Sequence, residues 1–171
     1  MNLMTSKTLL ITTIIIAGTL CGTTASAWGW GRAAAASCVA EKPYTGSAMV
    51  VTDNDGNLVN YSKLETAYVT CAVPDLSDKQ PNLFTWLGVY GESPQGFGVT
   101  ARACVKFWGY SGNRCGPWVI SYAKGNFGMS VDLTIWSTYS NDFKYLEIAL
   151  PLSSSGLRSG ASKFQGYAYN Y

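Results

Sequence analysis

The chain has 171 residues, and its 12 basic and 10 acidic side chains give a formal charge of +2 at pH 7. This balance lacks the excess of positive charge with which proteins bind nucleic acid or an anionic membrane. Histidine is absent, which excludes Ser-His-Asp and Cys-His catalytic sites and every metal centre held by imidazole. No feature of the composition calls for a cofactor.

The first 27 residues have the pattern of a secretory signal peptide. Lys7 provides the positive charge, and the uncharged apolar run over 8–20 is too short to cross a bilayer as a helix. Small residues from Ala25 to Ala27 fit the cleavage site, and removal of these 27 residues from the 171 leaves 144, beginning at Trp28. We therefore expect a secreted protein, with the periplasm or the outer membrane as the alternative destination.

Lipid attachment at Cys21 is a second fate for the same segment. Lipoproteins are cleaved directly before a cysteine, and the residue before it is small, whereas Leu20 stands there. Release as a soluble, oxidised domain is therefore preferred.

Four cysteines remain after cleavage, namely Cys38, Cys71, Cys104 and Cys115. An even number of cysteines in an exported chain favours two disulfides. Of the three connectivities we favour sequential pairing, because the last two cysteines then close a hairpin-sized loop. A four-thiolate zinc site is the alternative, but the paired C-x-x-C spacing that such sites use is absent.

After an extended leader at 28–46, which holds the first cysteine, residues 47–171 are expected to form a single β domain. The turn at Asp53-Asn54-Asp55-Gly56 lies between two apolar runs and predicts a hairpin. Strands are expected at 47–51, 57–61, 66–73, 82–90, 97–108, 117–122, 129–136, 144–151 and 164–171. The alternation is clearest along 97–108 and predicts a half-buried strand, with Val99, Ala101, Ala103, Val105 and Phe107 on the apolar face. With eight or nine strands and no helix outside the signal peptide, the fold class is all-β, a two-layer β-sandwich or jelly roll.

Aromatic residues are the feature most suggestive of function. The chain has 11 tyrosines, 6 tryptophans and 6 phenylalanines, more than a core of this size usually needs. Several fall on polar faces of the expected strands, and an exposed ring can stack on the apolar face of a sugar. The candidate ligand-stacking residues are Trp108, Trp118, Trp136 and Tyr139. We therefore expect a secreted, non-catalytic binding or structural module whose partner is a glycan or another cell-surface polymer.

A weak calcium candidate is formed by Asp53 and Asp55, which resemble part of a calcium-binding loop. An EF-hand would need a glutamate at the position of Ser62. Turn chemistry explains both aspartates, and no metal site is predicted.

A small outer-membrane β-barrel is the first alternative function. Tyr167, Tyr169 and Tyr171 alternate at the C-terminal end, as aromatic residues do in the last strand of such barrels. The expected disulfides and the charges and prolines within strands argue against this alternative.

A carboxylate-based glycan hydrolase is the second alternative. Such an enzyme needs only two acidic side chains that face each other across a cleft. The candidate acids are Glu65, Glu92, Asp132 and Glu147. No sequence feature brings any two of them together.

Several short segments are similar to those of a known group. They are Cys38, GNLVN at 56–60, VTCAVP at 69–74, ARACVKF at 101–107 and YLEIALP at 145–151. Together they resemble a loose group of exported, functionally uncharacterised β-sandwich proteins of myxobacteria and related bacteria. The resemblance implies a secreted two-layer β-fold and no mechanism. Members of that group often have a further cysteine where this chain has Ile148 or Ala149.

Overall fold

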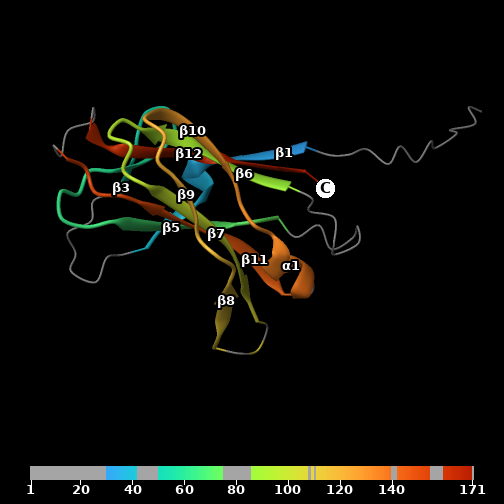
Figure 1. Ribbon diagram of the computed structural model, residues 1–171. Coiled ribbons are helices and arrows are strands. Elements are labelled where there is room, and N and C mark those ends of the chain that lie inside the picture. Colours follow the sequence, from blue (N-terminus) through green and yellow to red (C-terminus); the bar gives the residue numbers. More distant parts are fainter. Residues whose placement is uncertain are drawn as a thin grey trace, which may run out of the picture.

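The computed structural model describes residues 30–41, 50–74, 86–107, 109, 111–139, 142–154 and 160–170. The predicted signal peptide and the candidate Trp108 lie outside these residues. The described chain forms two antiparallel sheets and very little helix (Figure 1). Within it, no helix is long and apolar enough to cross a membrane.

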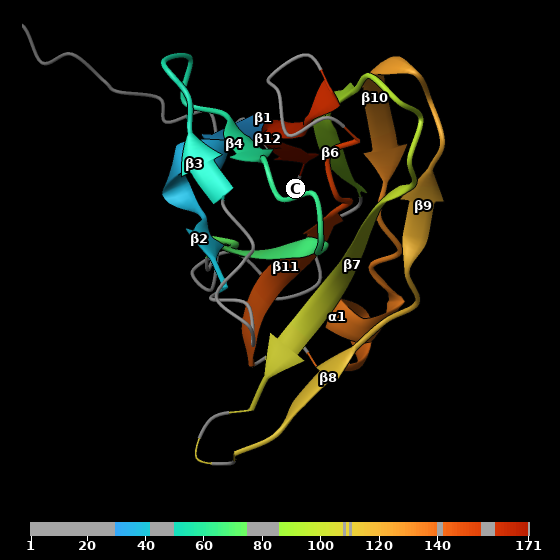
Figure 2. The same ribbon diagram turned by 90° about the vertical axis from the view of Figure 1, so that its left-hand side faces the viewer.

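The two sheets each contain six strands and pack as two layers, so the predicted β-sandwich is confirmed. The first sheet has the order β10 (Gly125–Ser130), β6 (Trp86–Ser93), β12 (Ser162–Asn170), β4 (Leu58–Asn60) and β3 (Val50–Thr52), and β1 (Trp30–Ala34) also pairs with β12. The second has the order β2 (Val39–Ala40), β5 (Ala67–Ala72), β11 (Phe143–Leu150), β7 (Val99–Lys106) and β8 (Asn113–Cys115), and β9 (Val119–Ser121) also pairs with β7. Figure 2 shows the β7–β8 hairpin extending beyond the rest of the second sheet.

The core lies between the sheets and follows the alternation of the strands. On β7, Val99, Ala101, Ala103 and Val105 are fully buried, as the alternating sequence predicts. They meet large apolar side chains from both sheets, including Leu87, Val89, Leu146, Ile148 and Phe164. Each fully buried side chain of this size stabilises the fold by about 1.5–3 kcal/mol.

Residues 30–40, expected as a leader outside the β domain, are part of the sandwich. Strand β1 pairs with β12 of the first sheet and β2 pairs with β5 of the second, with the 3-10 helix η1 (Ala35–Ser37) between them. The sequence of this segment lacks the alternation of a strand, in part because β1 needs a small residue where it packs closely against β12. A Cβ atom on Gly31 would lie 2.1 Å from the ring of Tyr169, so the close approach of β1 to that ring requires glycine.

The strand predicted at 129–136 is wrong beyond Ser130, where β10 ends, and so is the prediction that no helix follows the signal peptide. Residues 134–138 form the short helix α1 (Thr134–Thr138). Asp132 starts this turn, because its Oδ1 accepts hydrogen bonds from the hydroxyl and the backbone N–H of Thr134. These bonds hold the pKa of Asp132 below its usual value, since they favour the charged carboxylate.

Both predicted disulfides are confirmed, Cys38 with Cys71 and Cys104 with Cys115. The first ties the end of η1 to β5 in the core. The second joins residues that lie directly opposite each other on β7 and β8, so it closes the projecting hairpin on the outer face of the second sheet.

Tyr167 links the two sheets across the core. Its hydroxyl donates a 2.7 Å hydrogen bond to the carbonyl of Ala72, from β12 to β5. Burial, and to a smaller extent the neighbouring Tyr169, raises the pKa of Tyr167 to about 12, because the ionised phenolate is poorly solvated there.

We expect Tyr167→Phe to lower the free energy of unfolding by about 1 kcal/mol at pH 7, the usual net contribution of such a hydrogen bond. Because folding favours the protonated phenol, this stabilisation is complete below the unfolded-state pKa of about 10 and is lost as the pH rises toward 12. Urea unfolding of both proteins from pH 7 to 11.5 measures the difference. A difference that stays constant up to pH 11.5 would contradict the assignment.

Candidate functional site

The outer face of the second sheet carries a row of polar and aromatic side chains. Glu147 of β11 lies directly opposite Thr70 of β5 and Arg102 of β7, and directly opposed residues of antiparallel strands point to the same face. The neighbours of Glu147 along β11, Leu146 and Ile148, are fully buried. Glu147 and its two partners therefore point outward, in one row across three strands.

An ion pair occupies the middle of this row. Both Nε and Nη2 of Arg102 donate to Oε2 of Glu147. The two side chains are half-buried, and removing either charge would leave the other in a partly desolvated position, which is costly. The pair therefore holds the guanidinium group of Arg102 in one position on the sheet.

The Trp118 ring lies over this guanidinium group. The Cζ of Arg102 is 4.2 Å from the centroid of the Trp118 ring, a distance typical of a cation–π contact. The Tyr68 ring of β5 lies beside it, with 6.5 Å between the ring centroids. Trp118 is 39% exposed and Tyr68 is 44% exposed. We call Tyr68, Arg102, Trp118 and Glu147 the aromatic platform.

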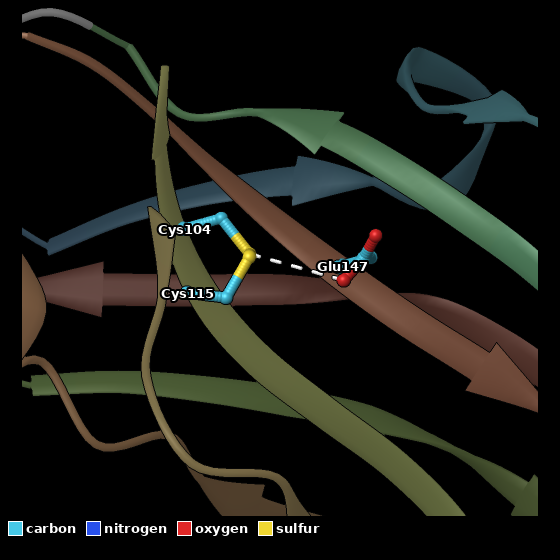
Figure 3. A group of neighbouring side chains, drawn as sticks. All are labelled: Cys104, Cys115 and Glu147. Carbon is cyan, nitrogen blue, oxygen red and sulfur yellow. Dashed lines mark hydrogen bonds between the residues drawn. A yellow bond between two sulfur atoms is a disulfide. The ribbon is translucent and has the colours of Figure 1, made fainter. Parts of the chain in front are cut away.

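The Cys104–Cys115 disulfide borders the platform. Figure 3 shows the Glu147 carboxylate beside it, with Oε2 3.8 Å from the Cys104 sulfur. The three side chains are close enough to hold a metal ion. Cysteine binds a metal as a free thiolate, however, and these two sulfur atoms are bonded to each other. The oxidised protein therefore offers no metal site here, and the disulfides also remove the zinc alternative.

Tyr145 completes this border from the next outward position on β11. Its hydroxyl accepts a 2.8 Å hydrogen bond from Nδ2 of Asn113 and lies 4.0 Å from the Cys115 sulfur. Burial raises the pKa of the Tyr145 phenol above its usual value. The phenol therefore stays neutral at physiological pH and adds no negative charge beside Glu147.

The candidates for ligand stacking that were chosen from the sequence differ in exposure. Trp118 lies on the surface. Trp136 does not, because α1 turns its ring into the core, where only 2% is exposed and Nε1 donates a 2.9 Å hydrogen bond to the carbonyl of Cys104. Its candidacy is therefore wrong. Tyr139 packs edge-on against Phe107, with 5.1 Å between the centroids, away from the platform.

Tyr68 is a platform residue that the sequence analysis did not select. Its signal is the alternation in 66–73, where Val69 and Cys71 face inward and are fully buried. A tyrosine out of phase with two buried residues points to the outer face. The sequence alone does not show that Trp118, which directly precedes β9, lies beside it.

The two candidate acids for hydrolysis that lie on strands, Glu92 of β6 and Glu147 of β11, are far apart. Glu92 lies on the outer face of the first sheet, paired with Lys163 at 2.7 Å. Glu147 lies on the outer face of the second sheet, paired with Arg102. The whole core separates these two carboxylates, and a glycosidase needs its acids within about 10 Å of each other. Asp132 is engaged by Thr134 at the start of α1.

The weak calcium candidates form the β3–β4 turn. Oδ1 of Asp53 accepts hydrogen bonds from the backbone N–H groups of Asp55 and Asn57, and Oδ2 accepts one from Nδ2 of Asn57. Gly56 adopts a positive φ of 80°, which this turn requires. The predicted hairpin is confirmed, and the carboxylate of Asp53 stabilises its turn through these hydrogen bonds.

Comparisons with known proteins identify no family. No protein-family model matches the chain, and no curated protein is significantly similar to it. One solved structure that is similar is that of TmCBM61 in complex with beta-1,4-galactotriose, with 12% sequence identity, coverage of 85% of this chain and 88% of that chain, and a TM-score of 0.29. A TM-score this low carries no argument about ligand or activity.

Proposed function

We propose that the protein is an exported, non-catalytic binding module that holds a neutral polysaccharide on the aromatic platform. The observation that carries this proposal is the support of Trp118. The ring is exposed to solvent and at the same time lies over a guanidinium group that is itself held by Glu147. A ring held in this way loses little conformational freedom when a ligand stacks on it.

The surroundings of the ring suit a sugar. The apolar face of a pyranose can stack on Trp118. The Tyr68 ring, tilted by 51° to the Trp118 ring, can contact the edge of the same sugar. Hydroxyl groups at the edge of the sugar can reach the charged oxygens and nitrogens of the Arg102–Glu147 pair. Thr70 lies next in the row, and its hydroxyl donates a 2.8 Å hydrogen bond to Glu41. These groups give polar contacts around an aromatic centre, the arrangement found in most small-ligand sites.

Export is part of the proposal. Two disulfides are typical of proteins that mature in an oxidising compartment. The first 27 residues have the pattern of a signal peptide, which would direct the chain to such a compartment. We propose a role without catalysis, because Glu92 and Glu147 stand on opposite faces of the sandwich.

Affinity electrophoresis tests the platform directly. The wild-type protein is run in native gels that contain soluble galactan, xylan, mannan or mixed-linkage β-glucan. We expect at least one of these to retard the wild type, and we expect Trp118→Ala to weaken that retardation at least tenfold, as for the loss of a central aromatic contact.

Phe143→Ala is the matched control. Phe143 is also an outward ring, 53% exposed, but it lies four residues from Glu147 along β11, about 13 Å away. Its removal should leave the retardation unchanged. If none of the four polysaccharides retards the wild type, or if Trp118→Ala is retarded as strongly as the wild type, the proposal fails.

A further inference from the structure

The outer face of the first sheet, on the other side of the sandwich, contains a groove. It is a cavity of about 580 Å³ over β1, β12 and β6, within the range of small-ligand sites. The residues that line it include Arg32, Ala34, Tyr90, Gln165, Gly166 and Ala168. This groove has no residue in common with the aromatic platform.

Small residues form the floor of the groove. Gly166 of β12 lies directly opposite Ala34 of β1 on one side and Tyr90 of β6 on the other. Its φ is 149°, and a Cβ atom there would lie 2.3 Å from the carbonyl oxygen of Ala33. Only glycine fits this position, because a side chain would collide with the backbone of β1. At this point the floor of the groove is therefore bare backbone.

The Tyr90 ring forms a wall of the groove. It is 39% exposed, and it lies over Gly128 of β10, where an added Cβ atom would be 3.2 Å from Cε1 of the ring. The Trp86 ring lies beside it, 6.4 Å away between centroids. Glycine beneath one ring and a second ring at its side hold Tyr90 in place with part of its surface open.

The groove carries one positive charge that the described chain does not neutralise. The guanidinium group of Arg32 is exposed and forms no ion pair with any residue in the part of the chain that the structure describes. Lys163, on the same face, is already paired with Glu92 at 2.7 Å. Gln165 adds an exposed amide at the groove, which can both donate and accept hydrogen bonds.

We propose that this groove is a second binding site, which takes a uronic acid residue of an acidic polysaccharide. The guanidinium group of Arg32 pairs with the sugar carboxylate, because a planar guanidinium matches a carboxylate with two parallel hydrogen bonds. The Tyr90 ring stacks on the sugar, and the Gln165 amide bonds its hydroxyls. Since the two sites lie on opposite faces, one molecule can bridge two polysaccharide chains.

The test compares polygalacturonate with its methyl ester, which keeps the sugar and removes the charge. Affinity electrophoresis of the full mature chain should show retardation by polygalacturonate that is at least tenfold weaker with the ester. Arg32→Gln should weaken retardation by polygalacturonate at least tenfold. Lys106→Gln removes the same charge from an exposed position on the second sheet, and it should bind as the wild type does.

Further variants test the stacking ring and the independence of the two sites. Tyr90→Phe keeps the ring and should retain binding, whereas Tyr90→Ala should lose it. Trp118→Ala should bind polygalacturonate normally, so failure of the platform and failure of the groove are distinguishable.

Three results would overturn the groove proposal. One is the absence of binding to polygalacturonate. Another is equal loss in Arg32→Gln and Lys106→Gln, which would show attraction by net charge alone. The last is equally strong binding of polyglutamate through Arg32, which would assign the groove to acidic peptides instead.

Discussion

Trp136→Ala is expected to lower the free energy of unfolding by about 3–5 kcal/mol, the usual cost of removing a large aromatic side chain from a core. The ring is only 2% exposed and packs in the core cluster between the sheets. Its Nε1 also donates the 2.9 Å bond to the carbonyl of Cys104. Truncation therefore leaves a cavity and removes a partner of a buried carbonyl group, and both effects act in the same direction.

Urea unfolding followed by circular dichroism measures this loss. Trp136→Phe separates the two contributions, since it keeps most of the buried ring and removes the hydrogen bond, so its loss should be intermediate. Trp118→Ala is the exposed counterpart and should cost less than about 1 kcal/mol. A loss below about 1 kcal/mol for Trp136→Ala would show that α1 does not hold this ring in the core.

The double replacement Cys38→Ala and Cys71→Ala is expected to cost about 4 kcal/mol. The two cysteines are 33 residues apart, and the entropy lost by the unfolded chain on closing a loop of that size corresponds to roughly that free energy. Cys71 is also fully buried between the sheets. The same change at Cys104 and Cys115, which are 11 residues apart, should cost about 3 kcal/mol.

Urea unfolding of the wild type and both double variants gives the order of these losses. Adding a reductant to the wild type should lower its stability at least as far as the Cys38–Cys71 variant. The reverse order, with the hairpin disulfide contributing more, would mean that the loop-closure argument does not govern stability in this fold.

The Arg102–Glu147 pair contributes more to positioning than to stability. A partly buried ion pair gains little net free energy, because desolvation offsets the attraction. Its value here is that it sets the guanidinium group beneath Trp118. The platform therefore depends on two successive contacts that join three groups, the carboxylate, the guanidinium and the ring. Each of the three groups comes from a different segment of the chain.

The local features of this protein could be predicted from its sequence. Alternation along 97–108 predicted which side of β7 is buried, Asp53 to Gly56 predicted a hairpin, and the spacing of the cysteines predicted both disulfides. These properties depend on neighbours in the chain, since side chains of a strand alternate with a period of two whatever the strand pairs with.

Which of these strands pair with one another could not be predicted from the sequence and is known from the fold. Tyr68, Trp118 and Glu147 come together because β5, β11 and β7 are neighbours and β9 pairs with β7, and no local pattern encodes that order. No local pattern predicts the groove either. Nor does one predict β1, because its sequence lacks the alternation of a strand and it forms a strand by pairing with β12. Trp136 shows the reason most clearly. Its place in an alternating run predicted an outward ring. The turn at Asp132 instead begins helix α1, and the helix directs the ring into the core beside β7. Burial of a large ring outweighs local propensity.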